Sequence, residues 1–182
     1  MTGALPTRVI LVEGVSDRVA VLAVARRLGR DLAGVAVVSA EGVGNFAALA
    51  ARYRGLGVPI TGLCDLAEVG WVCRALVKAK VGIALDRAGL AALGFQALDR
   101  DLEDELIRAV GLDRVLDLLA EQGDLEAFRT LQHQRAWRGA DLTDQLRRFL
   151  GAGAGRKIRY AAIFVEALAV GRMPRALVQV VC

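Results

Sequence analysis

The sequence has no uninterrupted run of about 18 uncharged apolar residues, the length that a membrane-spanning helix needs. Its hydrophobic share is nevertheless 55% of 182 residues, but Arg or Asp interrupts each Ala/Val/Leu run. The first residues, MTGALPTRVILVEG, also lack a basic segment before a long apolar stretch, so we expect no signal peptide. These absences predict one cytoplasmic globular domain with no membrane contact.

Cysteine and histidine are scarce. The three cysteines, Cys64, Cys73 and Cys182, have no CxxC spacing, which argues against a disulfide framework and a zinc site. His133 is the only histidine, and no Ser or Cys is suggested as its partner, so catalysis by a histidine base is not expected.

The charge is unevenly distributed along the chain. The net charge is +4, yet residues 1–128 carry 14 basic and 17 acidic side chains, whereas residues 129–182 carry 10 and 3. An acidic site beside a surface that attracts phosphate fits this asymmetry. Because 21 of the 24 basic residues are Arg, a GC-rich genome is a second explanation for the basic half.

Apolar runs alternate with helical patterns over the first 111 residues. The expected strands lie at 9–12, 35–38, 59–63 and 94–98, and the helices between and after them lie near 16–28, 45–54, 69–80 and 102–110. Ser16 is the expected N-cap of the first helix, which Gly29 closes. This alternation predicts an α/β fold with a parallel four-stranded sheet flanked by helices.

No strand pattern follows Gly111. Amphipathic helical stretches near 112–121, 124–131, 141–150 and 157–169 predict a helical C-terminal extension. We therefore divide the chain into an α/β core, 1–111, and a helical extension, 112–182, packed on that core.

Carboxylates follow three of the expected strands. Glu13 and Asp17 flank the turn at Gly14, Asp65 and Glu68 follow the third strand, and Glu103 belongs to the acidic run after the fourth. In an open parallel sheet the functional crevice lies beyond the carboxyl ends of the strands. Carboxylates gathered there repel one another unless a cation lies between them, so the pattern predicts a Mg²⁺ or Mn²⁺ site and phosphoryl chemistry. Single acidic residues in a first helical turn are also common as dipole partners.

Several motifs resemble those of a known family. Val12-Glu13-Gly14-Val15-Ser16-Asp17 resembles the first motif of the Toprim domain found in topoisomerases, primases and OLD-family nucleases. The turn at Gly42 and Gly44 is similar to the Gly-rich segment after the second Toprim strand, and Asp65 stands where the family has its DxD pair. The segments LEDEL at 102–106 and GRKIRYA at 155–161 resemble the TOPRIM nucleotidyl transferase/hydrolase domain proteins related to OLD.

The resemblance implies a Toprim-like, Rossmann-like fold and a Mg²⁺- or Mn²⁺-dependent nuclease, or a related phosphotransferase, acting on DNA or RNA. It implies Glu13, Asp65 and Lys157 as catalytic residues, and Glu13, Asp17, Asp65, Glu68 and Glu103 as metal ligands. It places Ala67 at the second Asp of DxD, so a catalytically weak module that binds nucleic acid or a partner ATPase is an alternative. The ATPase domain of OLD proteins is not in this sequence, so ATP control would come from a separate chain; a homodimer stays open.

Three further features are relevant to binding. Gly42–Ala47 also fits a GxGxxA dinucleotide fingerprint, which keeps a dinucleotide-binding oxidoreductase as a third function. Arg156, Lys157 and Arg159 start a helix after a Gly-rich turn, where a phosphate-contacting edge is expected. Arg135 and Arg138, which flank Trp137, are further candidates for nucleic-acid binding. Trp137 itself could stack on a base or serve as a half-buried anchor.

Overall fold

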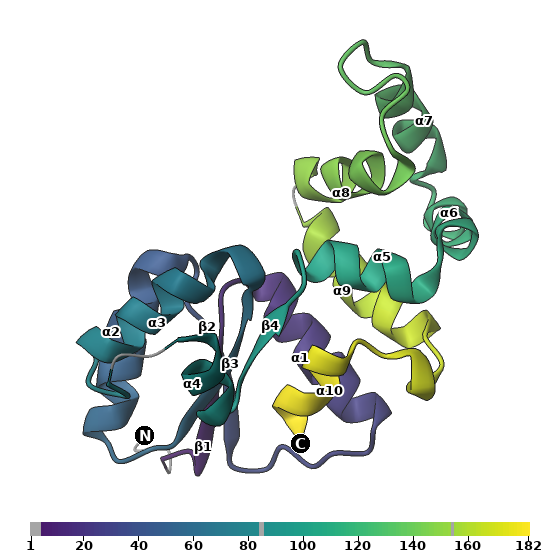
Figure 1. The fold of residues 1–182 in the computed structure, drawn as a ribbon. Helices are drawn as coiled ribbons and strands as arrows, with labels where there is room; N and C mark the ends of the chain where they lie inside the picture. Colours follow the sequence, from purple (N-terminus) through teal and green to yellow (C-terminus); the bar gives the residue numbers. More distant parts are fainter. Residues whose placement is uncertain (1–4, 84–85, 154) are drawn as a thin grey trace.

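The computed structural model describes residues 5–83, 86–153 and 155–182. At its centre is a parallel sheet in the order β2-β1-β3-β4 (Figure 1). The predicted four-stranded parallel sheet is therefore confirmed. The strands are β1 (Arg8–Val12), β2 (Val35–Ser39), β3 (Ile60–Asp65) and β4 (Phe95–Leu98).

Helices cover both faces of the sheet, as the uninterrupted apolar runs of β1 and β2 require. In β1, Val9 and Leu11 pack against α2, α3 and α4, while Ile10 and Val12 face α1 and the C-terminal helices. The helices on these faces are α1 (Val15–Arg27), α2 (Val43–Gly55), α3 (Val69–Lys78), α4 (Arg87–Ala92), α9 (Arg156–Ala167) and α10 (Arg175–Val181).

β3 approaches its neighbours closely at Gly62. A Cβ atom there would lie 2.5 Å from the carbonyl oxygen of Leu11 and 2.4 Å from the ring of Phe95. Only glycine lets the Phe95 ring cover β3 at this point, and the ring joins Phe46 in the core on the α2 side, with centroids 6.1 Å apart. This packing accompanies the register in which Phe95 lies beside Gly62 and Leu98 beside Asp65.

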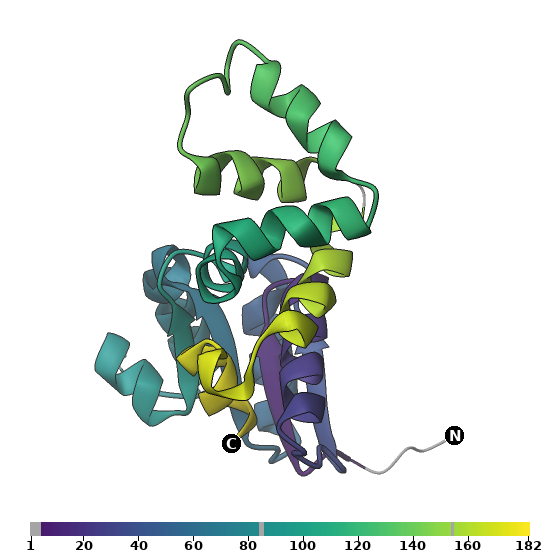
Figure 2. The same cartoon turned by 90° about the vertical axis from the view of Figure 1, so that its right-hand side faces the viewer.

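The remaining helices form an arm that projects from the sheet (Figures 1 and 2). The arm comprises α6 (Leu112–Glu121), α7 (Leu125–His133) and α8 (Leu142–Ala152), and α5 (Leu102–Val110) leads into it. Its interior holds Phe128 and Phe149, whose ring centroids are 5.3 Å apart. After the arm, α9 packs along α1 and α5, and α10 packs on β3, β4 and α1.

One buried cluster extends from Ile10 in β1 to Val181 in α10. It therefore crosses the boundary that we predicted at residue 111, and the division into 1–111 and 112–182 stays a prediction. The helical character of the second segment is as expected, because all four predicted helices after Gly111 are present.

Two local expectations need correction. Helix α1 begins at Val15, so Gly14 rather than Ser16 is its N-cap, and Ser16 is buried inside the first turn. The short helices α4 and α10 were not predicted; α10 is rich in Val, which by itself favours strands, and its packing on α1 and the sheet overrides that preference. None of the helices in the described ranges is long and apolar enough to cross a membrane.

Candidate functional site

A pocket of about 460 Å³ lies beyond the carboxyl ends of β1 and β3. Because these strands are neighbours, Glu13 and Asp65 come together there from distant parts of the sequence. The first turns of α1 and α9 complete its walls. We call this the acidic pocket; it is lined by Glu13, Gly14, Val15, Ser16, Asp17, Gly42, Asp65, Leu102, Gly155, Lys157 and Ile158.

Glu13 joins the ends of two strands. Its Oε1 accepts a hydrogen bond from the backbone N–H of Asp65 at 3.1 Å, which gives this half-buried carboxylate a polar partner. Burial raises the pKa of Glu13, the bond from Asp65 opposes the rise, and the negative charges of Asp17 and Glu68 add to it. The site thus concentrates negative charge that the protein only partly compensates.

Asp17 is fixed by the start of its own helix. Its Oδ2 accepts from the backbone N–H of Gly14 at 2.9 Å, so the side chain reaches back over the turn that follows β1. Burial raises the pKa of Asp17, while the Gly14 N–H and the Lys157 ammonium work in the opposite direction. The short β1–α1 turn therefore sets the positions of both Glu13 and Asp17.

Asp65 has the most perturbed carboxyl group of the pocket. Burial, followed by the charges of Glu13 and Asp17, raises the pKa of Asp65 from 3.8 to about 7. Within the described ranges, its side chain has no hydrogen-bond or ion-pair partner, in contrast to Glu13 and Asp17.

This perturbation predicts a pH-dependent stability for Asp65→Asn. The folded chain holds the Asp65 proton more tightly than the unfolded chain, so the contribution of this group to stability falls as pH rises from about 4 to 7. Solvent screening reduces the effect, and we expect Asp65→Asn to exceed wild type by about 1–2 kcal/mol at pH 8 without divalent metal, and by much less at pH 4. Urea unfolding at both pH values measures this. A less stable variant at pH 8 would show that the carboxylate has a stabilising partner.

Lys157 brings the positive charge into the acidic pocket. Its Nζ lies 3.0 Å from Oε2 of Glu103, a residue that is 7% exposed at the start of α5. Burial alone would lower the pKa of Lys157, but the charges of Glu103, Asp17 and Asp101 raise it overall, so it stays protonated. Glu103 therefore lies behind Lys157, and it is not among the described residues that line the acidic pocket.

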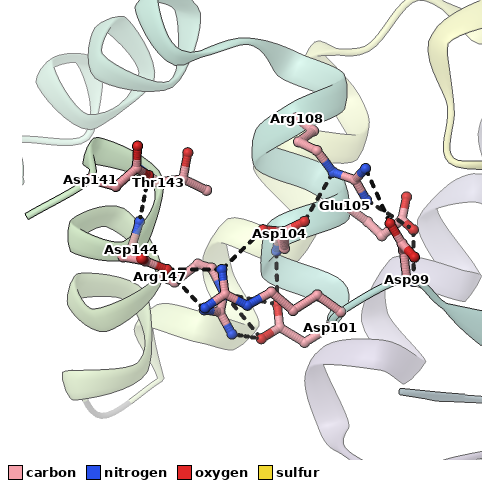
Figure 3. A network of polar contacts seen from close by, with 10 residues as sticks. Asp99, Asp101, Asp104, Glu105, Arg108, Asp141, Thr143, Asp144 and Arg147 are labelled. Carbon is pink, nitrogen blue, oxygen red and sulfur yellow. Dashed lines mark hydrogen bonds and ion pairs between the residues drawn. The ribbon is translucent and has the colours of Figure 1, made fainter. Parts of the chain in front are cut away.

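An ion-pair network holds the arm beside the pocket (Figure 3). Arg147 of α8 reaches Asp101, the N-cap of α5, with its Nε 3.1 Å from Asp101 Oδ2 and a second bond from Nη2. It also contacts Asp144 at 3.4 Å. Burial by itself would raise the pKa of Asp101, but the bonds from Arg147 outweigh burial and hold this pKa below its ordinary value. Sequence analysis missed this clamp, since no motif marks Arg147 and the acidic run around Asp101 resembles an ordinary first turn.

The DxD departure has a structural counterpart. Ala67 is exposed in the 3₁₀ turn Leu66–Glu68 that follows β3, and Glu68 is half-buried in the same turn. Glu68 is close enough to raise the pKa of Glu13 through its charge, but it is not one of the residues that line the acidic pocket. Of the two predicted glycines here, Gly42 lines the pocket with φ of 116°, and Gly44 is exposed in the first turn of α2.

The predicted phosphate-contacting arginines have intramolecular partners or lie elsewhere. Arg156 stacks on Phe149, with its Cζ 3.9 Å from the ring centroid, and donates to the Phe149 carbonyl at 2.8 Å. Arg159 pairs with Asp124, which also accepts from the Tyr160 hydroxyl at 2.9 Å. Arg135 and Arg138 are exposed after α7 on the arm. The contacts of Arg156 and Arg159 tie α9 to the arm, and none of the four arginines lines the acidic pocket.

The donor set suits a hard divalent cation, which prefers carboxylate oxygens. Among the described residues, however, no three Asp, Glu, His or Cys side chains form a ready-made ligand set. Glu13 and Asp17 each face a backbone N–H instead. Mg²⁺ is commonly held by one or two carboxylates with water and substrate phosphates, so the pocket fits this mode of binding rather than an all-protein cage.

Comparison with known proteins places this geometry in a family. Residues 6–66, which contain Glu13, Asp17 and Asp65, match the family model for the Overcoming lysogenization defect protein-like TOPRIM domain. The chain contains an OLD-like Toprim domain. No curated protein matches the sequence.

Solved structures extend the likeness of this Toprim protein beyond the matched segment. The C-terminal region of the Xanthomonas campestris pv. campestris OLD protein aligns with a TM-score of 0.69 and 25% identity over 97% of this chain and 93% of that one. The C-terminal region of the Burkholderia pseudomallei OLD protein aligns with a TM-score of 0.71 and 20% identity over 98% and 96%. The arm and the C-terminal helices are therefore part of a fold shared with these OLD regions, and Toprim domains of this kind point to metal-dependent functions related to nucleic acid.

Proposed function

We propose that this Toprim protein cleaves phosphodiester bonds of DNA or RNA with the help of Mg²⁺ or Mn²⁺. One observation carries the proposal: carboxylates from the end of β1, the start of α1 and the end of β3 share one pocket with a single lysine. Burial raises the pKa of all three carboxyls, and the charge of at least one neighbouring carboxylate adds to each rise. A bound cation would stabilise these three carboxylates. A cation and a lysine in one pocket can together neutralise the negative charge of a phosphodiester, which makes it the favoured substrate.

Glu13, Asp17 and Asp65 would hold the cation, with Glu68 as an outer contributor. When bound, the cation supplies positive charge that polarises a phosphate oxygen. Lys157 is the group of this chain that neutralises charge on the phosphate, because its Nζ stays protonated and lines the same pocket. Glu103 positions Lys157 from behind through the 3.0 Å contact.

The start of α9 adds a second source of positive potential. Gly155 caps this helix, and Lys157 and Ile158 of its first turn line the acidic pocket. Backbone N–H groups in a first turn have no partners within their helix, and the helix dipole favours an anion there. A phosphate bound at this end of α9 would lie between the carboxylates and Lys157.

Two other functions remain as alternatives. Two observations favour a catalytically weak Toprim module. Ala67 leaves the DxD position with one carboxylate, and Glu68 does not line the acidic pocket. A dinucleotide-binding oxidoreductase has less support. The Gly42 turn opens on a pocket whose acidic side chains would repel a pyrophosphate that carried no cation.

The test is incubation of the purified protein with supercoiled plasmid, single-stranded DNA and RNA, each with Mg²⁺, Mn²⁺ or EDTA. We expect nicked and linear plasmid, or shortened strands, with either metal and none with EDTA. Cleavage that is equal in EDTA would contradict the metal dependence. If the nucleic acids bind but stay uncleaved in every metal-containing reaction, the catalytically weak module is favoured instead.

A further inference from the structure

A second pocket of about 510 Å³ lies between the arm and the start of α5. We call it the Trp137 pocket. Lys157 lines both this pocket and the acidic pocket, so the two are neighbours. Its volume is within the range of about 300–1,000 Å³ that is typical of small-molecule sites. Its lining residues are Arg100, Asp101, Glu103, Trp137, Ala140, Asp144, Arg147, Arg148, Gly151 and Lys157.

The backbone at Trp137 is anchored to the arm. The Trp137 carbonyl accepts from Nε2 of Gln145 at 2.8 Å, and Gln145 is buried and also accepts from Gln132 at 2.7 Å. Trp137 is half-buried against the core of the arm, yet it lines the pocket. A partly exposed indole that packs against a core is a platform on which a planar ring can stack.

The guanidinium groups of the pocket differ in how they are used. Arg147 is clamped by Asp101 and Asp144 (Figure 3), and Arg100 pairs with Asp144 at 2.9 Å. Arg148, one residue further along α8, is exposed and makes no ion pair or hydrogen bond with any residue in the described ranges. The clamp therefore fixes the wall, while Arg148 keeps its charge available for a ligand.

We propose that the Trp137 pocket binds an unpaired nucleotide adjacent to the phosphate held in the acidic pocket. The base stacks on Trp137, and the neighbouring backbone phosphate contacts Arg148. A base inside a duplex cannot present its face to a side chain, so the inference selects single-stranded or locally opened nucleic acid as the substrate. It rests on the proposed function for its direction, but it concerns binding rather than cleavage.

Tryptophan fluorescence tests the stacking directly. The chain has two tryptophans, and Trp71 lies on α3, on the opposite side of the sheet, against Phe46. In a Trp71→Phe variant the emission comes from Trp137 alone. We expect saturable quenching when an eight-residue oligothymidylate is added in EDTA, and much less quenching with an abasic oligomer of the same length. Equal quenching by both oligomers, or none by either, would overturn the inference.

Two matched variants separate this pocket from the rest of the arm. Trp137→Phe retains Trp71 and an aromatic anchor; its fluorescence should not respond to the oligomer. Trp137→Leu should weaken oligomer binding by about five- to a hundredfold in a fluorescence-anisotropy assay. Circular dichroism must first show that this variant is folded like wild type. Unchanged affinity in folded Trp137→Leu would contradict the proposal.

Arg148→Gln should reduce the slope of log affinity against log salt by about 0.7, the value for one phosphate on a single strand. Arg129→Gln is the control, because Arg129 is exposed on α7 of the same arm but does not line the pocket. An equal change of the salt slope in both variants would show that Arg148 does not contact the phosphate. Since all these measurements are made without divalent metal, failure of plasmid cleavage leaves them interpretable, and loss of quenching leaves the cleavage result unaffected.

Discussion

Glu13→Gln is expected to reduce metal-dependent cleavage at least about a hundredfold. The substitution removes one negative charge, at nearly constant side-chain volume, from the cluster of Glu13, Asp17 and Asp65. Its side-chain carbonyl can still accept the hydrogen bond that Asp65 donates at 3.1 Å, so the ends of β1 and β3 stay joined. Initial rates of plasmid nicking in Mn²⁺, with circular dichroism as a check of folding, measure the effect.

The matched control is Glu126→Gln on α7, an exposed glutamate outside both pockets. It should cleave like wild type. Calorimetric titration with Mn²⁺ should show weaker binding to Glu13→Gln but not to Glu126→Gln. If Glu13→Gln nicks plasmid at the wild-type rate, the activity belongs to another site or to a contaminant.

The sheet was predictable because each of its strands carries an unambiguous local signal. A continuous apolar run such as 9–12, flanked by turn residues, is compatible with a strand covered on both faces, and parallel topology follows from the helices between the strands. That topology alone brings Glu13 and Asp65 to one edge. Both residues indeed line one pocket, 52 positions apart in sequence.

The arm contacts could not be predicted, because they depend on tertiary placement of single charged residues. Asp124, Arg159 and Tyr160 join α7 to α9, although the sequence offers only an acidic residue before one helix and a basic start to another. The basic start of α9 stays a predicted phosphate-contacting edge, and the stacking of Arg156 on Phe149 has no signal in the sequence. Of the three basic residues in that segment, only Lys157 lines the acidic pocket.

This division of roles along α9 sharpens the expectation for Lys157→Ala. We expect turnover to fall about a hundred- to a thousandfold, in the range for removing one group that stabilises transition-state charge. Affinity for an oligonucleotide should change by less than about fivefold, because Lys157 contributes a single phosphate contact. Single-turnover cleavage and anisotropy measure the two quantities separately, and Lys78→Ala on the exposed face of α3 serves as the control.

A structural effect of the same substitution can be separated from a catalytic one. Lys157→Ala leaves Glu103 buried without its partner at 3.0 Å, which we expect to lower the free energy of unfolding by about 1–2 kcal/mol. Adding Glu103→Gln removes the uncompensated charge, so the double variant should regain stability. If turnover also recovers, Lys157 acts only by neutralising Glu103; if stability returns while turnover stays low, the ammonium group acts on the substrate.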